Sequence, residues 1–192
     1  MQQVTIFDVV ERITALIRSE ERKKCTEYGL QSVHLQVLDY LSRCNKYSDT
    51  PAALTNYLGM TRGTVSQTLL LLEKKGFIKK TADTSDRRVV HLSLSAEGKA
   101  ILEKARPCEL FSQASNLLSG DEIKRYDEVL LTVLTALQKS NKSHSFGLCK
   151  TCQFFTLIPS GFLCGLTKEP LSEADSEKIC QEHTVPPTAL IR

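Results

Sequence analysis

Apolar residues recur at intervals of three and four along most of the chain, which is the spacing of an amphipathic helix. The first such stripe ends in the charged run SEERKK and predicts a helix near the N-terminus. Its members are Ile6, Val9, Val10, Ile13, Leu16 and Ile17. A second helix is predicted over SVHLQVLDYLSRC, where Leu35, Leu38 and Leu41 are in line. The pattern therefore predicts a mainly α fold.

Two shorter helices follow, separated by a tight turn. Thr50 is suited to cap the first of them and Pro51 to occupy its first turn, and Gly59 can take the positive φ that ends it. The second begins at once, with Thr61 as the N-cap of RGTVSQTLLLLEKKG and Gly76 as its end. Two short helices joined in this way predict a helix-turn-helix.

The next segment has the alternation of a β-hairpin. FIKKT is a short strand, TADTSD has turn chemistry, and VVHLSLS places Val90, Leu92 and Leu94 on one face. His91 falls on the other face, where we expect it to be solvated or to face a phosphate. A hairpin directly after a helix-turn-helix makes a winged helix, which can present polar side chains to the major groove of DNA and a basic tip to the minor groove.

Longer helices are predicted after the hairpin. One begins after Ser95, and Pro107 should kink or split it because proline removes a backbone hydrogen bond. The capping box SGDE at 119–122 opens another helix. The apolar stripe of that helix is Ile123, Tyr126, Leu130, Val133, Leu134 and Leu137. A small winged helix cannot cover both this stripe and the N-terminal one, so pairing of helices between two chains is expected.

Composition and charge narrow the class of protein. The 192 residues are 41 % hydrophobic, which allows one medium domain and an appendage. No apolar run approaches the roughly 20 residues of a membrane span, and the N-terminus lacks a secretory pattern, so a cytoplasmic location is expected. The net charge is only +3, but residues 61–91 carry seven basic and three acidic side chains, an excess that suits a polyanion.

The run LTNYLGMTRGTVSQTLLLLEKKGFIKKTADTSDRRVVHLSLSAEGKAIL resembles the signature segment of MarR-family transcriptional regulators. The shared features are the helix ending in LEKKGFI, the wing sequence DRR and the LS-x-x-G that opens the next helix. The helices on both sides follow the family order over residues 5–140. The resemblance implies a homodimer that binds double-stranded DNA and controls transcription, as a repressor, in response to a small-molecule or redox effector.

The resemblance also implies roles for individual residues. Side chains on the first two turns of helix 61–75 would read the major groove, and the wing tip at 83–88 would enter the minor groove. In the family the wing aspartate holds the arginine two positions later, and Asp86 and Arg88 match these roles. Arg87 would contact phosphate. The side chains that would face the major groove are Arg62, Thr64, Ser66 and Gln67.

Four of the seven cysteines lie in the last 44 residues, beyond the part that resembles the family. The polar run at 139–145 predicts a linker, which divides the chain into a winged-helix and dimerisation domain (1–138) and a cysteine-rich tail (146–192). Cytosolic thiols stay reduced, so this density predicts a metal site. The predicted ligands are Cys149, Cys152, Cys164 and Cys180, with His183 as an alternative to one of them.

Spacing does not separate the metals that such a tail could hold. Four thiolates suit zinc, which is slightly favoured, and they equally suit an iron–sulfur cluster. Thiols without metal are the third interpretation. A tail this short is unlikely to form a stable core unaided, which favours a metal that supplies folding energy.

The remaining candidates carry weaker signals. The sequence has no glycine-rich phosphate loop, nucleophile elbow or zinc-hydrolase histidine pair, so an enzyme is not expected. Cys25 is interpreted as a structural thiol, and Cys44 and Cys108 as small buried residues. Three hypotheses follow for the whole chain: a DNA-binding regulator with a structural metal tail, a redox or metal sensor whose tail controls DNA binding, and a regulator whose zinc-folded tail recruits a protein partner.

Overall fold

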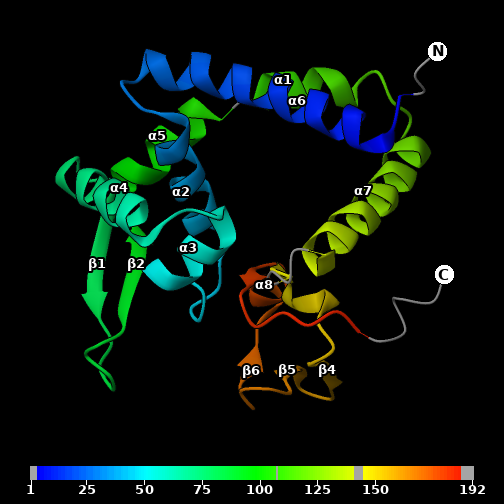
Figure 1. Ribbon diagram of the computed structural model, residues 1–192. Helices are drawn as coiled ribbons and strands as arrows, with labels where there is room; N and C mark the ends of the chain where they lie inside the picture. Colours follow the sequence, from blue (N-terminus) through cyan, green and yellow to red (C-terminus); the bar gives the residue numbers. More distant parts are fainter. Residues whose placement is uncertain (1–3, 107, 141–144, 187–192) are drawn as a thin grey trace.

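The computed structural model describes residues 4–106, 108–140 and 145–186, and it is mainly helical up to residue 140 (Figure 1). The helices of this first part are α1 (Ile6–Glu27), α2 (Ser32–Arg43), α3 (Pro51–Leu58), α4 (Arg62–Lys74), α5 (Ala96–Ala105), α6 (Cys108–Ser115) and α7 (Gly120–Ser140). Its hairpin consists of β1 (Ile78–Ala82) and β2 (Val90–Leu94). Among the described residues, no helix is long and apolar enough to span a bilayer.

Helices α2 to α5 and the β1–β2 hairpin form a winged-helix lobe around a closed apolar core (Figure 1). Leu38 of α2, Leu54 of α3 and Leu72 of α4 are completely buried. The ring of Tyr40 is also buried, and its hydroxyl donates a 2.7 Å hydrogen bond to the carbonyl of Ser48. Each leucine of this kind contributes about 1.5–3 kcal/mol through burial, so the lobe has its own stabilising core.

Local signals set the ends of α3 and α4 as the sequence predicts. Thr50 Oγ1 accepts a backbone hydrogen bond from the first turn of α3, and Thr61 Oγ1 does the same for α4. Pro51 occupies the first turn of α3. Gly59 and Gly76 have φ of 62° and 74°, a conformation that is strained for residues with a side chain. The predicted helix-turn-helix is confirmed.

The hairpin continues directly into α5 through a close contact. Ser95 caps α5, and its hydroxyl donates a 2.6 Å hydrogen bond to the carbonyl of Gly76. A Cβ atom on Gly98 would lie 2.0 Å from the carbonyl oxygen of Phe77. The sequence LS-x-x-G therefore has a steric cause, because only glycine lets α5 approach the start of β1 this closely.

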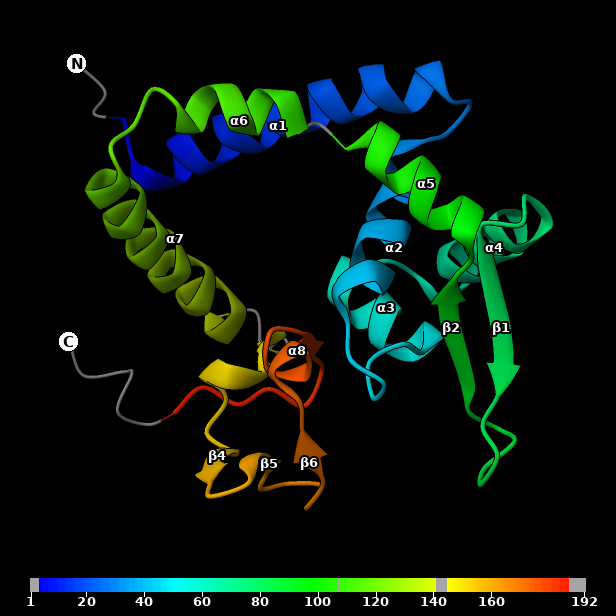
Figure 2. The same cartoon turned by 180° about the vertical axis from the view of Figure 1, so that it is seen from behind.

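Helices α1, α6 and α7 form an arm that leads away from the lobe (Figures 1 and 2). The predicted long helix is split: α5 ends at Ala105, its C-cap Arg106 has an extended ψ of 138°, and α6 begins at Cys108. Pro107, from which we expect the break, lies outside the described residues. Arg106 Nη2 contacts Asp39 Oδ1 of α2 at 2.6 Å and Ser42 Oγ at 3.0 Å, which holds the joint against the lobe.

Apolar side chains of the arm remain exposed in the single chain. The exposed fraction is 50 % for Leu16 of α1, 46 % for Leu130 and 49 % for Leu134 of α7. None of the described side chains of α7 is buried. The predicted capping box is present, since Ser119 and Glu122 exchange hydrogen bonds at the start of this helix. The arm is thus built of regular helices whose apolar faces lack a cover within the described part of the chain.

The tail consists of short elements arranged in two small sheets. They are β3 (Gly147–Leu148), the 3-10 helix η1 (Cys149–Thr151), β4 (Phe155–Ile158), β5 (Gly161–Cys164), β6 (Pro170–Leu171), α8 (Glu173–Ser176) and β7 (Ile179–Cys180). Strand β3 pairs with β7, and β4, β5 and β6 form an antiparallel sheet. The tail lies beside α3 and the loop that leads from α2 into it (Figures 1 and 2). Helix α7 continues to Ser140, and 141–144 lie outside the described residues.

Candidate nucleic-acid interface and cysteine centre

Helix α4 has one buried and one exposed face. Its buried side chains Val65, Leu69 and Leu72 pack into the lobe. The positive end of the helix dipole and the free N–H groups of the first turn face outward beside the polar side chains, an arrangement suited to a phosphate. The side chains predicted to face DNA are all exposed, namely Arg62, Thr64, Ser66 and Gln67.

The wing tip holds a bidentate ion pair. Arg88 Nε lies 2.9 Å from Asp86 Oδ1, and Arg88 Nη2 lies 2.8 Å from Asp86 Oδ2. The hydrogen bonds from Arg88 lower the pKa of Asp86, and the same contact raises the pKa of Arg88. The Arg88 side chain is 90 % exposed, and Arg87 beside it is exposed too. The tip therefore presents two guanidinium groups to solvent, one of them held in place by a carboxylate.

His91 does not have the environment that alternation along β2 predicts. Its Nδ1 lies 2.6 Å from Asp49 Oδ1, and its Nε2 lies 3.2 Å from Asp83 Oδ2. The contact with Asp49 raises the pKa of His91, with Asp83 adding to the effect. The expectation of a solvated or phosphate-facing imidazole was wrong. The ring joins the wing to the loop that precedes α3, because the two carboxylates come from different elements.

All four tail cysteines border one cavity of about 740 Å³. It lies between the tail and the tip end of the wing, and its walls include Phe154, Phe155, Leu166 and Leu171. Within the described residues, no group of three or more His, Cys, Asp or Glu side chains is arranged as a metal-ion site. The structure thus brings the four predicted ligands, Cys149, Cys152, Cys164 and Cys180, to a common cavity without gathering them around one point.

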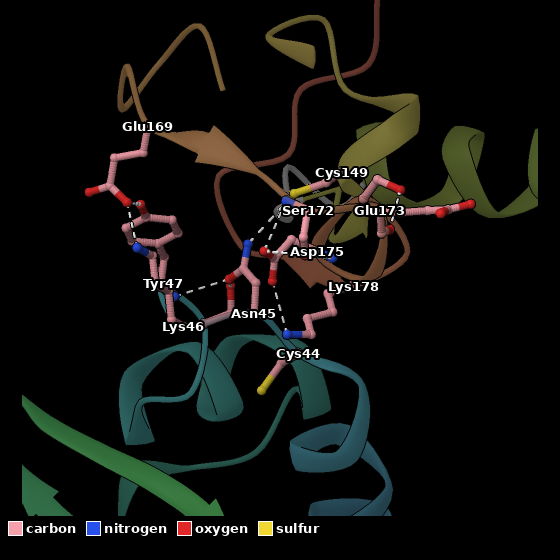
Figure 3. Close-up of polar contacts among 12 residues, drawn as sticks. Cys44, Asn45, Lys46, Tyr47, Cys149, Glu169, Ser172, Glu173, Asp175 and Lys178 are labelled. Carbon is pink, nitrogen blue, oxygen red and sulfur yellow. Dashed lines mark hydrogen bonds and ion pairs between the residues drawn. The ribbon is translucent and has the colours of Figure 1, made fainter. Parts of the chain in front are cut away.

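The thiols of this cavity differ in their surroundings. A hydrogen bond between Cys149 and Cys180 lowers the pKa of Cys180 to about 6 and raises that of Cys149. Asn45 Nδ2 lies 3.7 Å from Cys149 Sγ (Figure 3). The Thr184 N–H donates to Cys152 Sγ at 3.4 Å. Donors directed at cysteine sulfur are typical of thiolates that bind metal, because they stabilise negative charge on the ligand.

His183, the alternative ligand, is held elsewhere. Its Nδ1 lies 2.7 Å from Ser145 Oγ, and its Nε2 lies 3.0 Å from Thr151 Oγ1. Burial lowers the pKa of the ring, and a Cβ on Gly147 would lie 2.4 Å from Nε2. His183 therefore fastens η1 and β3 to the end of the tail, and His183 is not among the residues that line the cavity.

The cysteines outside the tail have unreactive surroundings. Cys25 is buried, and its burial raises the pKa of its thiol, as does the nearby Glu21. Burial raises the pKa of Cys44 to about 12. A thiol with a raised pKa holds little thiolate near neutral pH, so both positions fit the predicted structural role. The side chain of Cys108 lies outside the described residues.

The loop from Cys44 to Asp49 is a contact segment that the sequence did not reveal. It contacts the tail through Asn45, Lys46 and Tyr47, and Lys46 and Tyr47 both bind the carboxylate of Glu169 (Figure 3). These partners are more than 100 residues apart in the chain. The signal available was the polar sequence CNKYSD, which reads as an ordinary turn.

Comparisons with known proteins show what the winged-helix lobe resembles. Residues 28–89 match the model of the MarR family, a range that runs from the end of α1 through the wing tip. The chain is 28 % identical over 93 residues to the HTH-type transcriptional regulator PapX of Escherichia coli, a match of 48 % of this chain and 57 % of PapX. It is 22 % identical over 140 residues to the transcriptional repressor MprA of E. coli K12, a match of 72 % of this chain and 80 % of MprA.

A solved structure gives the same result for the fold. The MepR–DNA complex of S. aureus superposes with a TM-score of 0.59 at 21 % identity, covering 70 % of this chain and 99 % of MepR. Since the match spans little more than half of PapX, similarity to that regulator describes a region and not a whole protein. The fold over this region is therefore a winged helix like that of MepR.

Proposed function

Because residues 28–89 match the model of the MarR family, we propose that this chain is a homodimeric regulator of transcription that binds double-stranded DNA. The observation that carries the proposal is the pairing of a polar exposed face on α4 with a braced arginine at the wing tip. Helix α4 would enter the major groove, and Arg88 the minor groove, with Arg87 on phosphate. The relative MprA is a repressor, which favours repression as the sign of control.

The DNA-binding proposal is tested by the chain's choice of sites. Selection from a random duplex library with the full chain would yield preferred sequences, whose affinities are then measured by fluorescence anisotropy at several salt concentrations. Arg88→Ala should weaken binding and lower the slope of log K against log salt by about one. Gln67→Ala should change the preferred bases instead.

The control for this experiment also removes one arginine, but from a helix outside the proposed DNA interface. Arg12→Ala lies on the exposed part of α1 and should leave both affinity and salt slope unchanged. A wild-type chain that selects no sequence, or an Arg88→Ala chain with unchanged affinity at every salt concentration, would contradict the assignment of α4 and the wing.

A second function, a sensor, is favoured by the position of the tail on the DNA-binding lobe. We propose that the tail holds a metal centre whose ligands are Cys149, Cys152, Cys164 and Cys180. The donor set fits such a centre, because four thiols border one cavity and two of them receive N–H donors. Loading would require the side chains to turn toward a common point. The centre would supply folding energy to the tail and respond to the metal or redox state of the cell.

The metal is identified by measuring the metal content and the visible absorbance of the protein after anaerobic purification. One zinc per chain with no visible absorbance identifies a zinc centre, and iron with equimolar sulfide and visible absorbance identifies an iron–sulfur cluster. Cys152→Ser should reduce the bound metal in either case. Absence of both metals, even after incubation with zinc or with iron and sulfide, would contradict the metal proposal.

A further inference from the structure

Asn45 joins a tail cysteine to the DNA-binding lobe through a single buried side chain. The residue is only 6 % exposed. Its amide nitrogen is directed at Cys149 Sγ, and its Oδ1 accepts hydrogen bonds from Tyr47 N–H at 3.1 Å and Ser48 Oγ at 2.7 Å (Figure 3). A displacement of the Cys149 sulfur therefore acts on the side chain that shapes the loop from Cys44 to Asp49.

Backbone hydrogen bonds fasten the same loop to both neighbours of Cys180. Asn45 N–H donates to the carbonyl of Ile179 at 2.9 Å, and Gln181 N–H donates to Ser48 Oγ at 2.8 Å. The Gln181 side chain adds a bond to the carbonyl of Tyr47 at 2.7 Å. Two of the four cysteines are thus held against this loop, one through a side chain and one through its flanking backbone.

The far end of the loop contacts the wing and leads into the helix-turn-helix. The carbonyl of Asp49 accepts the N–H of Leu92 in β2 at 2.7 Å, and its carboxylate contacts His91. The next residue, Thr50, caps α3, the first helix of the helix-turn-helix. Asn45, which contacts Cys149, therefore lies only four positions before Asp49, which anchors the wing.

The cavity gives a second connection between the cysteines and the wing. Besides the four thiols, its walls include Asp83, Arg88 and His91 from the hairpin. Asp83 Oδ1 accepts the backbone N–H groups of Ser85 and Asp86 at 2.7 Å, which orders the turn that carries Arg88. The thiols and the arginine proposed to enter DNA thus face the same space.

On these contacts we propose that the loop from Cys44 to Asp49 transmits the state of the cysteine centre to the wing, with Asn45 as the positioning residue at Cys149. The inference rests on the proposed DNA-binding function and on the metal-binding tail. A metal ion bound by Cys149 and Cys180 would fix the positions of both sulfur atoms, and the loop is fastened beside them through Asn45 and Ser48. Loading the centre therefore fixes the loop and orders the wing for DNA.

A thermodynamic cycle on the full chain tests this coupling. DNA affinity is measured for the reduced chain after treatment with a chelator and again after addition of one equivalent of Zn²⁺, for wild type and for Asn45→Ala. We expect Zn²⁺ to strengthen DNA binding by about tenfold in wild type, within the usual range of allosteric coupling. In Asn45→Ala the ratio of DNA affinities with and without Zn²⁺ should fall to within about twofold of unity, while the zinc stoichiometry stays at the wild-type value.

The control variant breaks a neighbouring contact that does not involve a cysteine side chain. Lys46→Ala removes the ion pair with Glu169 on the same loop and should keep the wild-type ratio. An Asn45→Ala chain that also keeps this ratio would overturn the proposed transmission, as would a wild-type chain that binds DNA and zinc without coupling them. Failure of wild type to bind DNA at all would instead overturn the proposed function.

Hydrogen exchange on the wild-type chain provides a measurement that needs no variant. Addition of Zn²⁺ should slow exchange at Asn45, Ser48 and Leu92, whose N–H groups bond within or across the loop. The α2 core amides serve as the reference. Slowing confined to the tail, with no change at Leu92, would overturn the proposal even if Asn45→Ala fails to fold.

Discussion

The winged-helix lobe and the helical arm are built from equally regular helices but differ in what covers their apolar faces. Leu38, Leu54 and Leu72 of the lobe are completely buried, whereas Leu130 and Leu134 of the arm are nearly half exposed. Helical periodicity predicts both stripes equally well, because it shows which residues share a face and not what that face contacts. The apolar core of the lobe is closed within the described residues, whereas the arm leaves an apolar face open, which a second copy would cover in the proposed dimer.

The largest expected effect comes from the core of the lobe. Leu54→Ala removes a fully buried side chain and should lower the free energy of unfolding by about 2–5 kcal/mol. Unfolding in guanidinium chloride, followed by circular dichroism, measures this loss. The loss should be the same at low and high protein concentration, since the site lies inside a single lobe. A concentration-dependent loss would show that the lobe does not stand alone.

A substitution in the arm should instead weaken association of two chains. Leu134→Glu places a carboxylate on the apolar face of α7 and should raise the dissociation constant of the dimer by about 100-fold, because a charge buried at an interface loses its hydration. Analytical ultracentrifugation measures the association. Lys124→Glu, on an exposed position of the same helix, is the control. A dimer unaffected by Leu134→Glu would place the interface elsewhere.

The contact between hairpin and α5 gives a smaller effect within the lobe. Gly98→Ala would bring a Cβ to 2.0 Å from the Phe77 carbonyl oxygen, so α5 must shift, at about 1–3 kcal/mol of stability. Gly63→Ala is the matched control, because its Cβ would meet only Thr61 Oγ1 at 3.8 Å. That variant should stabilise α4 by about 0.5–1 kcal/mol. Thermal unfolding measures the stability of both variants. An equal change in stability for Gly98→Ala and Gly63→Ala would refute the steric argument.

The smallest expected effect depends on pH. The pKa of His91 is raised in the folded chain, so the stability from its ion pairs is fully present below pH 6.5 and is lost as the pH rises through the folded pKa. For a partly exposed pair this amounts to about 0.2–1 kcal/mol. Wild type should therefore exceed His91→Gln in unfolding free energy more at pH 6 than at pH 8.5. A difference that grows with pH would contradict the charge state inferred for His91.

The sequence predicted those features that local chemistry determines. The caps at Thr50 and Thr61 and the turn at Gly59 are decided by residues within four positions of one another, so their signals survive in a single sequence. The capping box at Ser119 and the break after α5 belong to the same class. The assignment of DNA contacts to Arg62, Gln67 and Arg88 came from resemblance, and it stays a prediction.

Features that depend on distant parts of the chain could not be predicted. The contact of Asn45 with Cys149 joins residues 104 positions apart, and nothing in either local sequence indicates it. His91 was misinterpreted for the same reason, because alternation along a strand does not reveal that Asp49 lies opposite. The cysteine spacing predicted that four thiols would converge, but their common cavity depends on how the tail packs against the lobe.

The joint at Arg106 has a mechanical consequence. A continuous helix between lobe and arm would resist bending along its whole length, whereas here α5 and α6 are separate and a side-chain clasp from Arg106 to Asp39 and Ser42 holds the angle. An ion pair can open and close without unwinding any helix. In the proposed dimer, two such joints would act as hinges. The two lobes could then adjust their separation to DNA sites of slightly different length.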